Sequence, residues 1–324
     1  MINKCLGCGI DLQNTDSDKD GYVESNKENK LCKRCFRLKN YGEYLNFNSN
    51  DFYLNINEIL KDEKSTILHV VDILNLNNEE ILGDRKKDSI LVINKKDIIP
   101  RSNNENTLLE NIKKIYPGYM NYIIISSKNN HNLDKLYDLL LKLKNNIYVV
   151  GYTNSGKSSL IKKLLKNYLN EEEELLTSYY PSTTLKNISF KLNDNLTLID
   201  TPGIVKNGSI LKRINLDEIK RVVIDNEIKP KIFQFNKKTI IKIDNYCVVE
   251  CNSLGKNSII IFASNRLNIE KQTNDVEGFC YEFKINNYKE IVISDLCVIR
   301  FGKETNIKVF IDKEVNVYER IKLT

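Results

Sequence analysis

The sequence lacks the hydrophobic segments that mark membrane and secreted proteins. No apolar stretch approaches the roughly 20 residues that a helix needs to cross a bilayer, which argues against an integral membrane protein. The first nine residues, MINKCLGCG, contain no hydrophobic core of a signal peptide, so we expect no cleaved presequence. Both absences predict a cytoplasmic protein that has no membrane partner.

Histidine is scarce, and cysteine is unevenly placed. Neither His69 nor His131 lies in a pattern that suggests a metal ligand or a nucleophile. Of the eight cysteines, four fall within the first 35 residues, and four are scattered between residues 247 and 297, where we expect them to be small core residues. Because the chain is long and has no signal peptide, this distribution predicts one metal site in a reducing compartment rather than a disulfide scaffold.

The N-terminal cysteines form two CxxC pairs, Cys5 with Cys8 and Cys32 with Cys35. Each pair places two thiolates on one tight turn, and two such turns complete a tetrahedral site that leaves no open position. We therefore expect a structural zinc ion that supplies folding free energy to this segment; the alternative is a pair of redox dithiols. Five basic residues near the second pair suit either phosphate contact or a solvated face: Lys30, Lys33, Arg34, Arg37 and Lys39.

The positive charge is concentrated toward the C-terminus. The 324 residues suffice for two or three domains, and the net charge is +6. Residues 204–324 hold 21 Lys and Arg against 16 Asp and Glu, whereas the preceding part is nearly neutral. This asymmetry favours a polyanionic partner for the C-terminal third.

The middle of the chain alternates between strand-like and helix-like patterns. Short apolar, β-branched runs at 66–73, 89–94, 121–126 and 147–151 are typical of buried parallel strands, and leucines recur at helical spacing between them. The pattern predicts an α/β domain with a doubly wound, mostly parallel sheet. After residue 204 it changes to many short β-rich segments. We expect a zinc domain of residues 1–45, an α/β domain of residues 46–208 and a β-rich domain of residues 209–324.

Residues 151–158, GYTNSGKS, fit the P-loop pattern G-x4-G-K-[ST] between a predicted strand and a predicted helix. Backbone N–H groups at the start of that helix would bind phosphate oxygens. Lys157 would reach the β- and γ-phosphates, and Ser158 would bind Mg²⁺. The nucleotide-binding residues expected here are Gly151, Asn154, Ser155, Gly156, Lys157, Ser158 and Ser159.

Two other strand ends indicate that the base is guanine. In Asn94-Lys95-Lys96-Asp97, the carboxylate can accept hydrogen bonds from guanine N1–H and the 2-amino group, a pair of donors that adenine does not offer. Ser126-Ser127-Lys128 resembles the SAK motif, whose middle backbone N–H contacts the guanine O6. The residues expected to bind the base are Asn94, Lys95, Asp97, Ser126, Ser127 and Lys128.

A further group of residues suits Mg²⁺ and the γ-phosphate. Asp200-Thr201-Pro202-Gly203 ends another predicted strand and supplies an aspartate and a glycine. Between it and the P-loop lies Pro181-Ser182-Thr183-Thr184, in which we take Thr184 as the Mg²⁺ ligand and Thr183 as the alternative. The expected Mg²⁺ ligands are Ser158, Thr184 and Asp200, and the expected catalytic residues are Asn154, Lys157, Thr184, Asp200 and Gly203.

These five motifs occur in a rotated order, with the base loops before the P-loop, and the chain resembles the circularly permuted GTPases of the YqeH type. The resemblance spans almost the whole chain and rests on CLGCG, CKRCFRLKNYGE, VVDILN, NKKD, YVVGYTNSGKSSLI, SYYPSTTL, LTLIDTPGI and SNRLNI. It implies a bacterial GTPase that assists assembly of the small (30S) ribosomal subunit, with nucleotide state controlling binding to rRNA or a pre-ribosome.

Two residues refine the expected chemistry. Ile204 stands where Ras-like proteins place the water-orienting glutamine, so intrinsic GTP hydrolysis should be slow. Asn154 matches an asparagine that binds K⁺ in potassium-activated GTPases, where the cation would neutralise developing charge; the alternative is that it only supports the loop. The expected cofactors are GTP or GDP, Mg²⁺, Zn²⁺ and K⁺.

Basic and aromatic residues intermingle at the start of the C-terminal domain, which suits RNA through phosphate contact and stacking. They are Lys229, Lys231, Phe233, Phe235, Lys237, Lys238 and Lys242. Two alternatives to a GTPase switch stay open. One is a passive RNA-binding scaffold in which the G domain has only a structural role. The other is a metabolic P-loop kinase or ATPase, against which NKKD argues.

Overall fold

The computed structural model describes most of the chain. The described residues are 4–5, 8–17, 19–23, 31–36, 51–77, 80–100, 104–143, 145–169, 187–204, 206–253 and 255–323. Several predicted functional residues lie outside these ranges: Lys30, Arg37, Lys39, Thr183 and Thr184.

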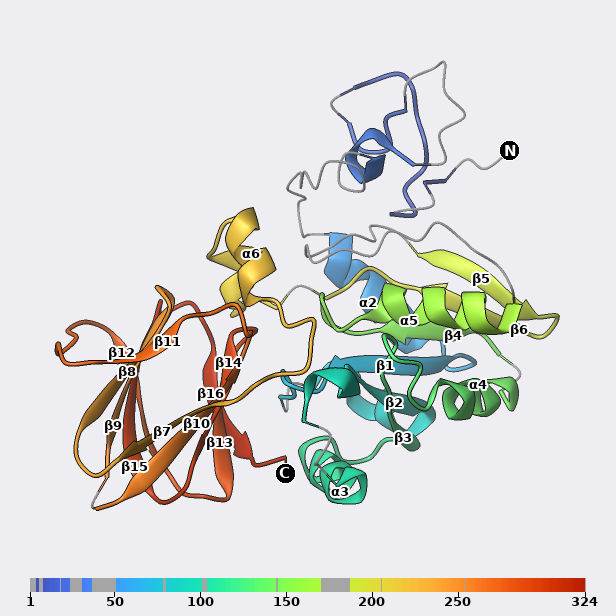
Figure 1. The fold of residues 1–324 in the computed structure, drawn as a ribbon. Coiled ribbons are helices and arrows are strands. Elements are labelled where there is room, and N and C mark those ends of the chain that lie inside the picture. Colours follow the sequence, from blue (N-terminus) through green and yellow to red (C-terminus); the bar gives the residue numbers. More distant parts are fainter. Residues whose placement is uncertain are drawn as a thin grey trace. The chain divides into compact units, whose positions relative to one another are not determined.

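A six-stranded sheet forms the middle of the chain (Figure 1). Its strands lie in the order β3-β2-β1-β4-β6-β5, and every neighbouring pair is parallel except β5 with β6. The bounds are Thr66–Asp72 for β1, Ser89–Asn94 for β2, Asn121–Ile124 for β3, Ile147–Val150 for β4, Ile188–Asn193 for β5 and Leu196–Asp200 for β6. The predicted α/β fold with a mostly parallel sheet is confirmed.

Helices with a leucine-rich face pack against this sheet. Strands β1 and β2 are buried over nearly their whole length, as inner parallel strands usually are. The buried leucines of α4 (Leu133–Leu141) and α5 (Lys157–Leu164) share one hydrophobic core with the apolar side chains of β1, β2 and β4. Helix α2 (Asp51–Lys61) precedes β1, and a π-helical turn, Leu165–Leu169, continues α5. None of the helices in the described ranges combines the length and the hydrophobicity of a membrane-spanning segment.

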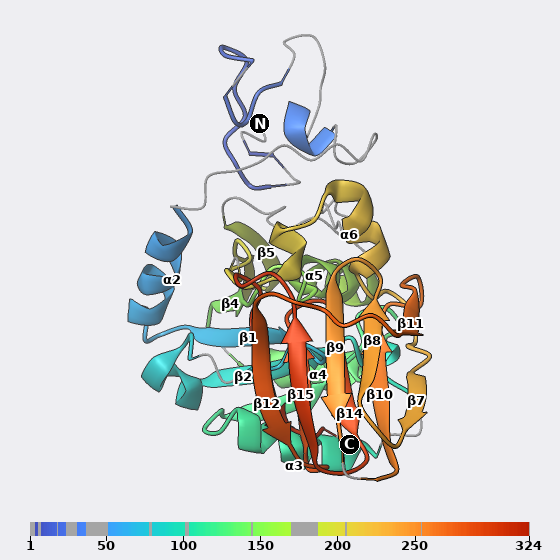
Figure 2. The same ribbon diagram turned by 90° about the vertical axis from the view of Figure 1, so that its left-hand side faces the viewer.

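Antiparallel strands dominate a second compact unit at the C-terminal end. They form two five-stranded sheets, in the orders β16-β13-β14-β10-β7 and β11-β8-β9-β15-β12, and Figure 2 looks onto the second one. The bounds are Lys231–Phe235 for β7, Thr239–Ile243 for β8, Cys247–Asn252 for β9, Asn257–Ala263 for β10, Ile269–Gln272 for β11, Cys280–Ile285 for β12, Lys289–Ile293 for β13, Cys297–Phe301 for β14, Thr305–Phe310 for β15 and Val317–Ile321 for β16. The short helix α6 (Leu216–Val222) precedes them and begins with a capping box at Asn215. The predicted β-rich C-terminal fold is confirmed.

The second unit also contains two earlier segments of the chain, residues 74–79 and 97–117. The Leu76 carbonyl accepts hydrogen bonds from the Tyr318 hydroxyl at 3.2 Å and from Arg320 Nη1 at 3.0 Å. Helix α3 (Glu105–Ile115) contacts β16, and its Asn111 amide donates to the carbonyls of the two residues after that strand's end, 322 and 323. The connections that follow β1 and β2 are therefore part of the packing of the β-rich unit.

A buried carboxylate between two arginines lies in the same unit. Glu290 on β13 is fully buried, and its two oxygens accept from Arg300 Nε at 2.6 Å and from Arg320 Nε at 2.8 Å. The Arg300 guanidinium also lies 4.6 Å from the centre of the Phe262 ring. Removing the carboxylate would leave two cations poorly solvated and without a counter-charge.

We expect Glu290→Gln to lower the free energy of unfolding by about 3–5 kcal/mol, because both guanidinium groups lose their buried counter-charge. The matched control is Glu319→Gln, which removes a partly exposed pair with Lys289 and should cost about 1 kcal/mol or less. Urea denaturation followed by circular dichroism measures both. Equal losses in the two variants would contradict a special role for the buried carboxylate.

Candidate functional site

The loop between β4 and α5 carries the predicted phosphate-binding residues. The Lys157 ammonium group is buried and donates to the carbonyl oxygens of Gly151, at 2.9 Å, and Tyr152, at 3.1 Å. Burial lowers the pKa of Lys157 to about 8, and the nearby Asp200 carboxylate opposes that shift. Phosphate oxygens beside this ammonium group would favour its charged form.

The buried amide of Asn94 connects three of the predicted loops. Its Nδ2 donates to the Ser155 carbonyl at 3.0 Å, and its Oδ1 accepts from the backbone N of Ser127 at 3.1 Å and from the Ser127 hydroxyl at 2.9 Å. A Cβ at position 156 would lie 2.3 Å from Asn94 Nδ2, and φ there is +90°, so Gly156 is required. The structure thus brings Asn94 of NKKD, Ser127 of SSK and Ser155 of the P-loop together beyond the carboxyl ends of β2, β3 and β4.

Other predicted residues of the two base loops, NKKD and SSK, have contacts of their own. Lys95 has a φ of +67°, and its Nζ forms an ion pair with Asp72 Oδ2 at 2.8 Å. The buried Ser126 hydroxyl accepts from the backbone N of Asn129 at 3.0 Å and so shapes the SSK loop, in which Lys128 is exposed.

The residues on the predicted Mg²⁺ side are neighbours. Ser158 Oγ donates to Asp200 Oδ2 at 2.9 Å, and Asp200 is fully buried at the end of β6. A Cβ at position 203 would lie 2.8 Å from Lys157 Nζ, which places Gly203 next to the ammonium group. The backbone of Ile204 pairs with that of the P-loop.

Two buried polar atoms of the P-loop, Asn154 Nδ2 and Ser155 Oγ, have no hydrogen-bond partner among the described residues. A buried polar atom without a partner costs free energy, and both atoms lie in a loop whose pattern binds phosphate. The φ of Asn154 is +62°, a conformation that asparagine adopts more readily than most residues. Bound phosphates and their cations would supply the missing partners, so the loop fits a nucleotide.

Some predicted roles stay predictions. Thr184 and its alternative, Thr183, lie outside the described residues. Asp97 lies in a 3₁₀ turn, Lys96–Ile98, and is the first residue of the segment 97–117 that is grouped with the β-rich unit. Ser159 is half-buried in the first turn of α5.

Sequence reasoning missed two charged residues of this region. Asp72, the partner of Lys95, ends β1 as Asn94 ends β2, and this shared position at a strand end could have revealed it. Lys206 is buried, with its Nζ 6.0 Å from the centre of the Tyr152 ring in the P-loop. Nothing in the pattern after DTPG distinguishes Lys206 from other lysines.

The four N-terminal cysteines form a compact, buried cluster. The sulfur atoms of Cys5, Cys8, Cys32 and Cys35 all lie within 4.8 Å of one another. Cys8 Sγ and Cys32 Sγ are 3.7 Å apart. Bonds of about 2.3 Å to a tetrahedral zinc ion would place two sulfurs about 3.8 Å apart. The backbone N of Cys32 also donates to Cys5 Sγ at 3.2 Å, which favours a thiolate, so the cluster fits structural zinc.

Comparison with known proteins gives the family. A family model described as "RsgA GTPase" matches residues 81–209, and one described as "50S ribosome-binding GTPase" matches residues 146–294. The uncharacterized protein YqeH of Bacillus subtilis (strain 168) is 31% identical over 292 residues, which are 86% of this chain and 80% of that protein. The chain belongs to the YqeH-type family of circularly permuted GTPases.

The chain is also similar to a longer plant protein and to a solved bacterial structure. NO-associated protein 1, chloroplastic/mitochondrial, of Arabidopsis thaliana is 22% identical over 277 residues, which are 72% of this chain and 49% of that protein. The chain thus spans about half the length of this plant relative. The crystal structure of YjeQ from Thermotoga maritima is 20% identical, covers 44% of this chain and 48% of that chain, and has a TM-score of 0.30.

Membership of the YqeH-type family implies binding and hydrolysis of GTP with the help of Mg²⁺. The residues present suit that chemistry, since Ser158 and Asp200 offer neighbouring oxygens for Mg²⁺ and Lys157 offers a buried cation for phosphate. Mg²⁺, when bound, would neutralise charge on the phosphate oxygens.

We expect Asn94→Ala to weaken GDP binding about 30-fold or more, because it leaves the Ser155 carbonyl and two Ser127 donors unpaired at a cost of roughly 2–3 kcal/mol. Ser127→Ala removes one of these hydrogen bonds and should weaken binding only about fivefold. Titration with a fluorescent GDP analogue measures both affinities. An Asn94→Ala protein with a native circular dichroism spectrum that binds GDP like the wild type would show that the amide does not assemble the site.

Proposed function

We propose that this GTPase is a switch in the assembly of the small ribosomal subunit, and that its nucleotide state controls binding to rRNA or a pre-ribosome. The observation that carries the proposal is the Asn94 amide, which bonds to both the SSK loop and the P-loop and so supports one guanine-nucleotide site formed by the three loops. Family membership and the positive charge after residue 203 support a ribosomal partner. One matching family model names the 50S subunit, so a test has to include both subunits.

We propose three functional domains: a zinc domain of residues 1–45, a GTPase domain of residues 46–208 and an RNA-binding domain of residues 209–324. The last two are linked by a short stretch of chain. The backbone of Ile204 pairs with the P-loop, and the Gly208 carbonyl accepts from the backbone N of Asn316, at 2.8 Å, in the β-rich unit. A movement of Gly203 upon loss of the γ-phosphate would therefore reach the β-rich unit within a few residues.

The proposal is tested by co-sedimentation with purified 30S and 50S subunits in the presence of GDP, a non-hydrolysable GTP analogue or no nucleotide. The salt concentration is held fixed, because phosphate contacts make binding steeply salt-dependent. We expect binding to 30S subunits that differs between the nucleotide states, and no such difference for Lys157→Ala, which loses the phosphate-binding ammonium group. Preference for 50S subunits, or equal binding in all three states, would refute the proposed switch.

We further propose that K⁺ binds at Asn154 and accelerates an intrinsically slow hydrolysis. The buried amide of Asn154 has an Nδ2 without a partner among the described residues, and an amide can present its oxygen instead by a 180° turn. Ile204 follows Gly203, and its side chain carries no polar atom with which to orient water, so hydrolysis needs other help, which a bound cation would give by neutralising charge.

GTP hydrolysis measured in equal concentrations of KCl and NaCl should be faster in KCl by about tenfold or more, since the cation neutralises charge that develops in the transition state. Asn154→Gly keeps the positive φ without steric cost and removes the ligand, so its two rates should converge. Asn130→Gly, at another asparagine with positive φ, is the control and should keep the wild-type ratio. Equal rates of the wild type in both salts would rule out the K⁺ site.

A further inference from the structure

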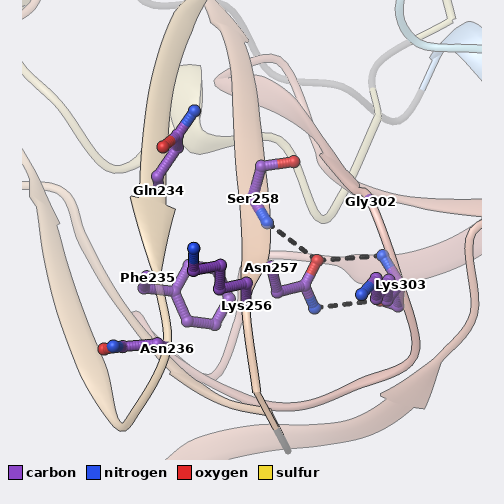
Figure 3. Close-up of a pocket in the computed structure, with 8 residues that line it drawn as sticks. All are labelled: Gln234, Phe235, Asn236, Lys256, Asn257, Ser258, Gly302 and Lys303. Carbon is purple, nitrogen blue, oxygen red and sulfur yellow. Dashed lines mark hydrogen bonds between the residues drawn. The ribbon is translucent and has the colours of Figure 1, made fainter.

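A polar pocket lies in the β-rich unit, at the edge of the sheet that ends with β7 (Figure 3). The end of β7, the start of β10 and the turn between β14 and β15 form its walls. Its volume is about 550 Å³, which lies in the range of roughly 300–1,000 Å³ found for ligand pockets. None of the residues that line the pocket is among the residues predicted to bind or hydrolyse the nucleotide.

A saturated network of hydrogen bonds holds the pocket in shape. The buried amide of Asn257 donates to Thr305 Oγ1 at 2.7 Å, to Ser253 Oγ at 3.1 Å and to the Lys303 carbonyl at 3.2 Å. Its oxygen accepts from the backbone N of Ser258, at 2.8 Å, and of Lys303, at 2.9 Å (Figure 3). These hydrogen bonds fix the turn after β14 against β10. Because they use all the donors and acceptors of the Asn257 amide, contacts to a ligand come from its neighbours.

Gly302 lies close to β10 in this turn. A Cβ at position 302 would lie 2.8 Å from Ser258 Oγ, so a larger residue there would require the Ser258 side chain to turn away. The Phe235 ring is 6% exposed and supplies the apolar part of the wall. The pocket is therefore formed before any ligand binds, which limits the entropy lost on binding.

Four of the residues that line the pocket are cationic or bear an exposed amide. Lys256 and Lys303 are exposed, and neither pairs with a carboxylate of the described residues. Glu304, the acid next to Lys303, is engaged with Lys284 at 3.1 Å. The amides of Gln234 and Asn236 add both donors and acceptors.

A third ammonium group adds positive charge nearby, since Lys271 Nζ donates to the Gln234 carbonyl at 2.8 Å. Lys238, which the sequence pattern included among the RNA-binding residues, differs: it lies between Glu250, at 3.2 Å, and Asp275, at 2.6 Å. Its charge is thus neutralised locally. Lys256, Lys303 and Lys271 differ from Lys238 in that none of them forms an ion pair with a carboxylate of the described residues.

We propose that this pocket binds one nucleotide of single-stranded RNA. The ammonium groups of Lys256 and Lys303 contact the phosphates on either side of the bound nucleotide, and the amides of Gln234 and Asn236 bind the edge of its base. An acidic peptide would also contact the two lysines, and its backbone N–H and C=O groups would pair with the amides, so competition by poly-glutamate is what separates the two kinds of ligand. The inference rests on the proposed RNA-binding function of the β-rich domain and assigns that function to particular residues.

The test uses the full chain and a fluorescein-labelled, single-stranded RNA of 12 nucleotides, with binding followed by fluorescence anisotropy at several salt concentrations. The variant is Lys256→Gln with Lys303→Gln. Its matched control is Lys284→Gln with Lys308→Gln, which removes the same charge from two lysines of the same unit that are paired with Glu304 and Glu282. Circular dichroism and thermal unfolding check the fold of both proteins.

We expect the pocket variant to bind the RNA about tenfold more weakly, and its slope of log affinity against log salt to be smaller by about 1.4, since each phosphate contact to a single strand contributes about 0.7. The control variant should bind as the wild type does. Gln234→Ala with Asn236→Ala should change the order of affinity among homopolymers of A, C, G and U and leave the salt slope unaltered.

Four outcomes would overturn the assignment. If the pocket and control variants lose the same affinity, the lysines act only through net charge. If poly-glutamate competes as well as RNA of equal charge, the pocket binds acidic peptides. If the pocket variant binds RNA and 30S subunits like the wild type, the pocket assignment fails while the proposed function stands. If the wild type binds neither RNA nor subunits, both the pocket assignment and the proposed function fail.

Discussion

The hydrogen bonds of the Asn94 amide hold together the three loops that carry the predicted nucleotide-binding residues. Asn94 lies at the end of β2 and bonds to loops that follow β3 and β4, so the parallel arrangement of these strands is what allows the contact. Parallel strands place their carboxyl ends at one edge of the sheet whatever their order in the chain. The YqeH-type family can therefore permute the order of its motifs and keep the same site.

Sequence patterns revealed the parallel sheet well and the β-rich unit only in outline. Continuous apolar runs such as SILVIN mark inner strands that are buried along their length, and the P-loop spacing is dictated by phosphate chemistry. Strand β11, with the sequence IEKQ, is short and mostly polar, so it carries little hydrophobic signal, and β12, with the sequence CYEFKI, is only partly buried. Helix α2 was missed for a similar reason, because its sequence DFYLNINEILK mixes polar and apolar residues without a clear boundary.

The charged residues of the β-rich unit show why the roles of side chains could not be predicted from the sequence. Lys238 looked like an RNA-binding residue, yet the carboxylates of Glu250 on β9 and of Asp275 in the loop after β11 neutralise it. Phe235 looked available for stacking but is buried. Lys256 and Lys303 attracted no attention, because they are far apart in the sequence and only the pairing of β10 and β14 brings their strands together. Partners of this kind are decided by tertiary structure.

The interleaving of the two compact units has a consequence for synthesis. Residues 74–79 and 97–117 leave the ribosome early, but they pack with residues 207–324, which are made last. At about 5–20 residues per second, α3 waits roughly 10–40 s before β16 is available to it. During that interval the buried leucine and isoleucine of α3, Leu108 and Ile112, are open to chaperones and to aggregation. A nascent chain that stops short of β16 would therefore leave a defect in the connection between β2 and β3, far from its own end.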